Sequence, residues 1–140
     1  MKNLILIVTV LLGMISLNVN AQDSDFQLVE KTVNSYMDGL VSGNAEMITK
    51  AFHKDATMKM IGEKGYESYN AIEALTADLT AIPKETTTTR IVSINITGNS
   101  ASAQLEIQLA ELTYIDFMQI LKINGEWKIV SKIFYTRHHN

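Results

Sequence analysis

The first half of the chain spaces its apolar residues every three to four positions, which is typical of amphipathic helices. The longest such segment is predicted over residues 23–40, with apolar positions at Phe26, Val29, Val33, Tyr36, Met37 and Leu40. A shorter helix is predicted over residues 45–52, with Asn44 as its N-cap. A third is predicted over residues 69–82, and Pro83 ends it.

After this proline the pattern changes to alternation of apolar and polar residues, which predicts strands with one covered face. Two pairs of alternating segments surround two-residue turn signals: residues 86–97 and 100–111 around Gly98-Asn99, and residues 114–123 and 126–135 around Asn124-Gly125. Weaker alternation over residues 56–61 indicates one further strand. Helices followed by a four-stranded antiparallel meander predict a single α+β domain with its helices on one face of the sheet.

The turn at Asn124-Gly125 fixes the register of the closing hairpin, because a type I′ turn pairs Ile123 with Glu126. Counting outward places five cross-strand pairs on one face: Lys122–Trp127, Ile120–Ile129, Met118–Ser131, Asp116–Ile133 and Tyr114–Tyr135. This face is mainly apolar and aromatic, yet it carries the carboxylate of Asp116. We therefore expect a pocket, or the rim of the sheet, at this residue.

The neighbouring hairpin places one cation on its apolar face. Pairing Thr97 with Ser100 puts Arg90 opposite Ile107. Since an uncompensated buried charge is expensive, Arg90 and Asp116 are expected to contact each other or a ligand. Two interpretations remain open: a structural ion pair near solvent, which is favoured, and a site in which Asp116 is a general base or accepts a hydrogen bond from a ligand.

His53 is the second candidate for acid–base chemistry, because the ordinary pKa of histidine lies near neutrality. The alternative is that His53 shapes a helix-to-strand turn together with Asp55, whose side chain can bond nearby backbone N–H groups. The other histidines, His138 and His139, stand near the end of the chain with no third ligand at a recognisable spacing, so no metal site is predicted. The sequence contains no phosphate loop or dinucleotide motif, and no cofactor is predicted.

The N-terminal residues predict export. Lys2 precedes an apolar run over residues 4–12, and Val19-Asn20-Ala21 forms a small-residue cleavage pattern. We predict a signal peptide over residues 1–21 rather than a membrane anchor, since the run is too short to span a bilayer comfortably. The remaining residues 22–140 correspond to about one domain, expected in the periplasm or outside the cell.

Composition narrows the expected partners. The chain has no cysteine, which excludes disulfides, thiol chemistry and a lipid-modified cysteine anchor. The formal net charge is −3 and no basic stretch is present, so neither nucleic acid nor an anionic membrane is an expected partner. Hydrophobic residues make up 46% of the chain, which is enough to build an ordinary core without cross-links.

A family resemblance rests on three local patterns: Tyr36-Met37-Asp38-Gly39-Leu40 followed by Gly43-Asn44, Ala51-Phe52-His53-Lys54-Asp55-Ala56, and the closing hairpin from Asn124 to Phe134. Together with the order of the elements, they make the chain similar to the nuclear transport factor 2-like (NTF2-like) superfamily, and within it to the putative lumazine-binding, SnoaL-like group. The resemblance covers essentially all of residues 22–140. It implies a strongly curved antiparallel sheet wrapped around three N-terminal helices as a cone with an interior cavity. It also implies a homodimer through the outer face of the sheet.

These observations predict an exported protein that binds a small, largely apolar molecule, since such molecules are held in mostly apolar cavities with a few polar groups. The residues expected to orient the ligand are Tyr36, Arg90, Tyr114, Asp116, Ser131 and Tyr135. Similar proteins include isomerases, dehydratases, polyketide cyclases and non-catalytic binders. One alternative is therefore a cofactor-free enzyme of this kind in which Asp116 or His53 moves a proton. Another is an assembly module whose cavity is filled by its own side chains.

Overall fold

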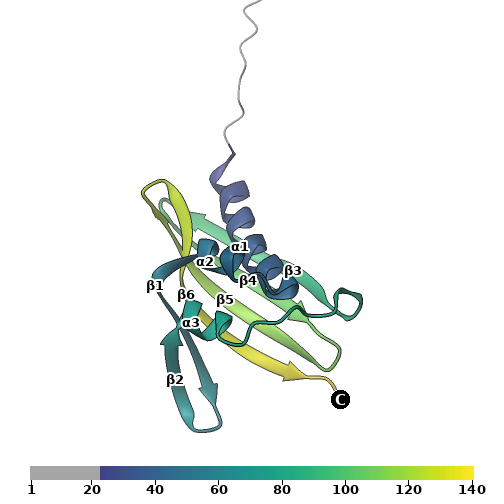
Figure 1. Ribbon diagram of the computed structural model, residues 1–140. Helices are drawn as coiled ribbons and strands as arrows, with labels where there is room; N and C mark the ends of the chain where they lie inside the picture. Colours follow the sequence, from purple (N-terminus) through teal and green to yellow (C-terminus); the bar gives the residue numbers. More distant parts are fainter. Residues whose placement is uncertain (1–22) are drawn as a thin grey trace, which may run out of the picture.

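A strongly curved sheet of six strands, in the order β2-β1-β6-β5-β4-β3, forms the body of the computed structural model (Figure 1), which describes residues 23–140. The strands are β1 (Phe52–Gly62), β2 (Gly65–Asn70), β3 (Thr88–Thr97), β4 (Ser100–Gln108), β5 (Leu112–Ile123) and β6 (Glu126–His138). The helices are α1 (Asp25–Ser42), α2 (Ala45–Ala51), α3 (Ala71–Thr76) and the short 3-10 helix η1 (Lys84–Thr86). The predicted α+β class is confirmed. The predicted signal peptide, residues 1–21, lies outside the described residues.

Helix α1 is closed at both ends by its own sequence. Ser24 and Gln27 form a capping box, in which each side chain accepts a hydrogen bond from the other residue's backbone N–H. Gly43 ends the helix in the left-handed conformation, with φ of 68°, which glycine adopts without strain. Four of the predicted apolar positions, Val29, Val33, Tyr36 and Met37, are buried, whereas Phe26 is 51% exposed.

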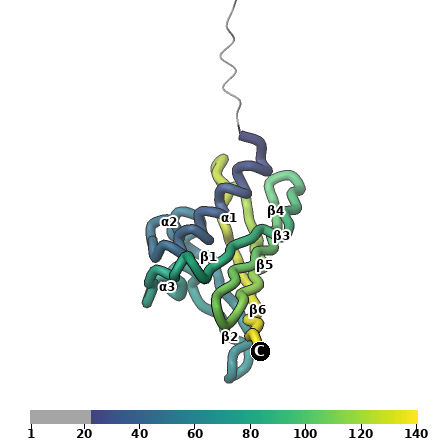
Figure 2. The backbone as a smooth tube through the Cα atoms, turned by 90° about the vertical axis from the view of Figure 1, so that its right-hand side faces the viewer, coloured from purple at the N-terminus to yellow at the C-terminus, as the bar shows by residue number. Residues whose placement is uncertain are grey.

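The helices lie together on one face of the sheet (Figures 1 and 2). Helix α1 packs against β3, β4 and β6, and α2 packs against α1. The core between these layers is apolar, and it includes Ile48 of α2 with Leu105, Met118 and Ile129 of the sheet. Asn44 caps α2 as predicted, because its side chain accepts hydrogen bonds from the backbone N–H groups of residues 46 and 47.

The first half of the chain contributes more sheet than the alternation indicated. Strand β1 starts directly after α2 and pairs in parallel with β6, and β2 pairs antiparallel with β1. The predicted meander is present as β3–β6 and the predicted further strand as β1, whereas β2 was not predicted and the helix predicted over residues 69–82 is confined to Ala71–Thr76. The helix α3 is one short segment that begins after Asn70, whose side chain accepts from the backbone N–H of Glu73. Tyr69, where the predicted helix began, belongs instead to β2 and pairs with Met58 of β1.

The β3–β4 and β5–β6 hairpins each contain one β-bulge, which changes the faces of the residues beyond it. In the β5–β6 pair the register shifts between Gln119 and Ile120, so the predicted pairs from the turn to Ile120–Ile129 are right. Beyond the bulge, Asp116 lies opposite Phe134 and not Ile133. In the β3–β4 pair the shift falls between residues 91 and 93, and Arg90 lies opposite Glu106 and not Ile107.

Candidate functional site

A cavity of about 370 Å³ lies between the helices and the sheet. Its walls come from α1, β1, α3 and the segment after it, the end of β4, β5 and β6. The residues that line it are Tyr36, Leu40, Met58, Ala74, Leu75, Asp78, Leu79, Thr80, Ile82, Leu109, Tyr114, Lys132 and Phe134. Most of these side chains are apolar or aromatic, so the few polar groups among them decide how a ligand would be oriented.

Three polar side chains meet at this cavity, and we call them the Asp116 cluster: Tyr36, Asp116 and Lys132. The Tyr36 hydroxyl donates a hydrogen bond of 2.8 Å to Asp116 Oδ2. The Lys132 ammonium forms an ion pair with Asp116 Oδ1. Asp116 is completely buried and does not line the cavity, whereas its two partners do. The carboxylate therefore lies one layer behind the cavity wall and acts on the cavity through Tyr36 and Lys132.

Burial controls the protonation of this cluster. It lowers the pKa of Lys132, and the charge of Asp116 and its hydrogen bond oppose that change. Burial, followed by the charge of Asp116, raises the pKa of Tyr36 well above its ordinary value. Tyr36 is consequently a neutral donor at all physiological pH values. Lys132 Nζ also lies 4.6 Å from the ring centre of Phe134 and 5.4 Å from that of Tyr36, which are cation–π distances.

The structure brings three of the predicted ligand-orienting residues together. Tyr36 and Tyr114 line the cavity, and Asp116 contacts Tyr36. Tyr114 packs edge-on against Phe134, with 6.1 Å between ring centres. The role of these residues in binding stays a prediction.

The predicted contact between Arg90 and Asp116 is wrong. The bulge in β3 turns Arg90 to the outer face of the sheet, where its guanidinium forms an ion pair with Glu106. The Arg90 side chain is 62% exposed. The cation that Asp116 required is Lys132, which comes from the adjacent strand.

Ser131 and Tyr135 are also placed differently from the prediction, because the bulge in β6 moves both out of the cavity face. Ser131 accepts a hydrogen bond of 3.4 Å from the Thr57 hydroxyl of β1. Tyr135 is 63% exposed. Neither residue lines the cavity.

Lys132 is the residue that the register from the turn missed. Strand β6 contains two pairs of adjacent apolar residues, Ile129-Val130 and Ile133-Phe134. Because an apolar residue of each pair faces inward whichever alternation is chosen, the sequence does not show which residues of β6 face the core. One signal was present in the sequence: a buried Asp116 needs a cation, and Lys132 is one position away from the predicted inward face. Moving it inward requires one bulge between Ile129 and Lys132.

His53 stands at the start of β1 and does not line the cavity. Its Nδ1 accepts a hydrogen bond of 3.3 Å from the backbone N–H of Asp55. The geometry matches the interpretation of His53 as a turn-shaping residue and provides no support for it as an acid or base acting in this cavity.

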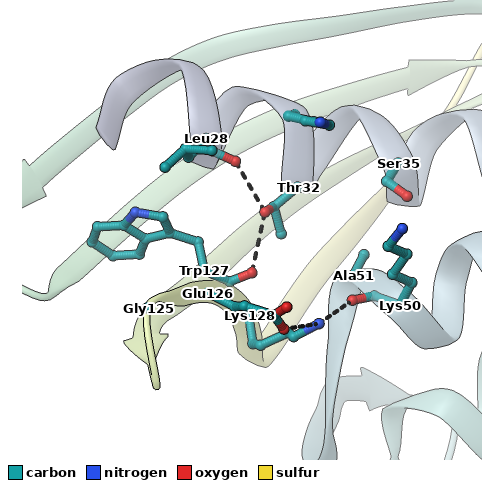
Figure 3. A pocket seen from close by; sticks show the side chains of 10 residues that line it. Leu28, Thr32, Ser35, Lys50, Ala51, Gly125, Glu126, Trp127 and Lys128 are labelled. Carbon is teal, nitrogen blue, oxygen red and sulfur yellow. Dashed lines mark hydrogen bonds and ion pairs between the residues drawn. The ribbon is translucent and has the colours of Figure 1, made fainter. Parts of the chain in front are cut away.

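A second, smaller cavity of about 260 Å³ lies between α1, the end of α2 and the β5–β6 turn (Figure 3). Its polar groups bond with one another. The Thr32 hydroxyl donates to the backbone oxygen of Trp127 at 3.1 Å, and Lys128 Nζ donates to the backbone oxygen of Lys50 at 2.8 Å (Figure 3). Lys128 also pairs with Glu126. These contacts join the helices to the β5–β6 hairpin. We therefore interpret this second cavity as structural and call it the structural notch.

Over residues 23–140, no group of three or more histidine, aspartate or glutamate side chains is arranged to hold a metal ion. In the same part of the chain, no helix has both the length and the apolar character needed to cross a membrane.

Comparison with known proteins gives one family and one fold. Residues 24–135 match the family model described as putative lumazine-binding. The chain is 27% identical to the aldolase FrzH of Cladobotryum sp., over 81% of this chain and 92% of that protein. It is 30% identical to an NTF2-like protein of unknown function from Methylobacillus flagellatus KT, with a TM-score of 0.69 over 85% of this chain and 97% of the other.

Two further solved structures share the fold at lower identity. An NTF2-like protein of unknown function from Shewanella baltica OS155 is 21% identical, with a TM-score of 0.71 over 83% of this chain and 98% of the other. A putative scytalone dehydratase from Novosphingobium aromaticivorans DSM 12444 is 15% identical, with a TM-score of 0.58 over 80% and 83% of the two chains.

Proposed function

The chain belongs to the putative lumazine-binding family and has the NTF2-like fold that its sequence predicted, and from this premise we propose that it binds a small, largely apolar molecule in the cavity beside the Asp116 cluster. The family and the fold indicate small-molecule binding or isomerase-type chemistry. The ligand lies among the apolar side chains of the cavity, and its polar group meets Lys132, Tyr36 and Tyr114.

The observation that carries this proposal is a fully buried charge placed directly behind the wall of an apolar cavity. A buried ion pair is seldom worth more to stability than apolar residues of the same volume. A cluster used only for packing would gain nothing from lying beside 370 Å³ of open volume. The same volume argues against an assembly module whose cavity is filled by its own side chains.

Native mass spectrometry of the protein purified from its own host tests the binding. The expected result is a retained molecule that is released on denaturation. The variant Ala74→Phe places a ring at a lining position of α3 and should abolish retention. Ala77→Phe is the matched control, because Ala77 ends the same helix without lining the cavity. Equal retention by both variants, or no retained molecule in the unmodified protein, would contradict the proposal.

An enzyme of the isomerase, dehydratase, cyclase or aldolase type is the second candidate. Two observations favour it: the similarity to a protein named as an aldolase, and a carboxylate held behind two cavity-lining groups that can carry protons. Such chemistry removes a proton next to a carbonyl group. Small ketones incubated with the protein in D2O should gain deuterium next to the carbonyl, and Asp116→Asn should lose that exchange. Exchange at the uncatalysed rate would remove this candidate.

Export and dimerisation remain part of the proposal. Residues 1–21 act as a signal peptide, and the mass of the protein recovered outside the cytoplasm should correspond to residues 22–140. The outer face of β5 and β6 exposes Phe117, Ile133 and Tyr135, which supports assembly of two copies through this face. Light scattering should give a dimer, and Ile133→Lys should convert it to a monomer; a monomeric unmodified protein would contradict this part.

A further inference from the structure

Lys132 differs from the other lysines of the described chain. Within residues 23–140 it is the one lysine whose side chain is buried, 4% exposed, and it nevertheless lines the cavity. The most buried of the others with a charged partner, Lys128, keeps 23% exposure and faces the structural notch. An ammonium group in water holds its proton at neutral pH and has no free electron pair with which to attack a ligand.

The surroundings of Lys132 favour a neutral amine. Its side chain is 4% exposed, so little water is present to solvate an ammonium group, and among the described residues its one charged partner is the carboxylate of Asp116. In this apolar setting, transfer of the proton from Lys132 to Asp116 converts two charges into a neutral pair. The lowered pKa of Lys132, caused by burial, acts in the same direction.

Asp116 Oδ1 is the atom that can take this proton. Tyr36 occupies the other oxygen, Oδ2, with its hydroxyl hydrogen. Oδ1 is buried and, apart from the ion pair with Lys132, has no hydrogen-bond partner among residues 23–140. The carboxylate therefore has one oxygen that is committed to Tyr36 and one that is free to accept a proton from the amine.

We propose that Lys132 forms an imine with the carbonyl group of the bound molecule, so that the ligands of this cavity are small, largely apolar aldehydes and ketones. This inference rests on the proposed binding function and adds the chemical class of the ligand. Desolvated lysines in apolar pockets are the usual nucleophiles of this chemistry.

The bonds and protons balance within the site. Lys132 gives its ammonium proton to Asp116, and the free electron pair of Nζ then forms a bond to the carbonyl carbon while the C=O π electrons move to oxygen. The oxygen takes up the second proton of the nitrogen and the proton held by Asp116, and leaves as water. The products are a C=N bond and one water molecule, with no oxidant or reductant required.

Reductive trapping with benzaldehyde tests the inference on the full-length protein. Sodium cyanoborohydride reduces an imine to a stable secondary amine, and peptide mapping locates it. At pH 7 we expect Lys132 to be labelled at least about tenfold faster than Lys128, because the cavity holds the aldehyde beside Lys132 Nζ and burial lowers the pKa of this amine. Equal labelling of Lys132 and Lys128 in the unmodified protein would overturn the inference, and this outcome does not depend on any variant.

Two variants sharpen the result. Lys132→Arg keeps the cation beside Asp116 and should lose the rapid label, whereas Lys128→Arg should retain it. A thermal shift with benzaldehyde alone separates this inference from the proposed binding. If benzaldehyde stabilises the protein but Lys132 stays unlabelled, imine formation is overturned and binding stands. If benzaldehyde neither stabilises the protein nor labels Lys132, and no host molecule is retained, both are overturned.

Discussion

The β3–β4 and β5–β6 hairpins each carry a bulge, and the two bulges have opposite effects on a charged side chain. In β6 the extra residue turns Lys132 inward, where it meets Asp116. In β3 it turns Arg90 outward, where it meets Glu106. Both cations pair with a carboxylate on the neighbouring strand, yet the Lys132 pair is buried beside a cavity, whereas the Arg90 pair lies on the outer face with the Arg90 side chain 62% exposed.

This difference shows that the surroundings of an ion pair, more than its contacts, determine what the pair contributes. In water, two opposite charges gain little by meeting, because each is already solvated. In the interior, removal of one charge strands the other, and the cost is that of an unsolvated ion. The two pairs therefore make different predictions for the same kind of substitution.

The largest effect is expected from breaking the buried pair. Asp116→Leu should lower the free energy of unfolding by about 3–5 kcal/mol, because it leaves the Lys132 ammonium buried without a partner. The double variant Asp116→Leu with Lys132→Met removes both charges and should lie within about 1 kcal/mol of the unmodified protein, or above it. Urea unfolding measures both, and a single variant as stable as the double one would refute the comparison.

A smaller loss is expected from the neutral member of the cluster. Tyr36→Phe removes the hydroxyl that donates to Asp116 Oδ2 and leaves that oxygen without this donor. The expected cost is about 1–3 kcal/mol of the free energy of unfolding. Tyr114→Phe is the matched control, since no hydrogen bond of the Tyr114 hydroxyl holds the cluster together; similar losses from both substitutions would show that the tyrosine hydroxyls matter only through general packing.

The buried pair should also give stability a dependence on pH. Burial lowers the pKa of Lys132 in the folded protein below its ordinary 10.5. At pH values between the folded and the unfolded pKa, the unfolded chain therefore binds more protons than the folded one. The free energy of unfolding should therefore rise with pH across that window, by at most about 1.4 kcal/mol per pH unit. Above pH 10 the raised pKa of Tyr36 acts oppositely, because the unfolded tyrosine loses its proton first.

Urea titrations between pH 7 and pH 10 measure this slope. The double variant Asp116→Leu with Lys132→Met lacks the buried amine and should show a flatter profile over the same range. Parallel profiles would mean that the Lys132 amine has the same pKa in the folded and the unfolded protein, which would contradict this prediction.

The smallest effect is expected from the exposed pair. Arg90→Ala should change the free energy of unfolding by no more than about 1 kcal/mol, because the Arg90 side chain is largely in solvent. Repeating the measurement in 1 M salt should reduce the difference further, since mobile ions screen exposed charges. A loss as large as that of Asp116→Leu would mean that the outer face is covered in solution, which dimerisation through this face would explain.

The sequence predicted the class of fold, the long helix and the turns because these depend on local patterns. The apolar spacing of α1 and the Asn124-Gly125 turn act over a few residues, and both are found where expected. The strand β2 was missed because its pairing with β1 decides its conformation, and that contact is tertiary. The bulges were missed because adjacent apolar residues, as at Ile133-Phe134, fit either face.

The candidate site was predicted in part for the same reason. Tyr36 and Asp116 lie on segments with an unbroken pattern, and the structure joins them by a hydrogen bond. Arg90, Ser131 and Tyr135 lie beyond a bulge, and each is found on the other face. The need of a buried carboxylate for a cation predicts a partner for Asp116 without reference to strand register. That partner is Lys132.

The parallel pairing of β1 with β6 has a consequence for how the chain acquires its structure. β6 is the last strand in chain order, yet it occupies a central place between β1 and β5. During synthesis the β1–β2 hairpin and the β3–β4–β5 meander are complete before the strand that joins them exists. Contacts of such long sequence separation form slowly. We therefore expect the two parts of the sheet to remain unpaired until residues 126–138 are available, and the cavity to lack its β6 wall, Lys132 and Phe134, until then.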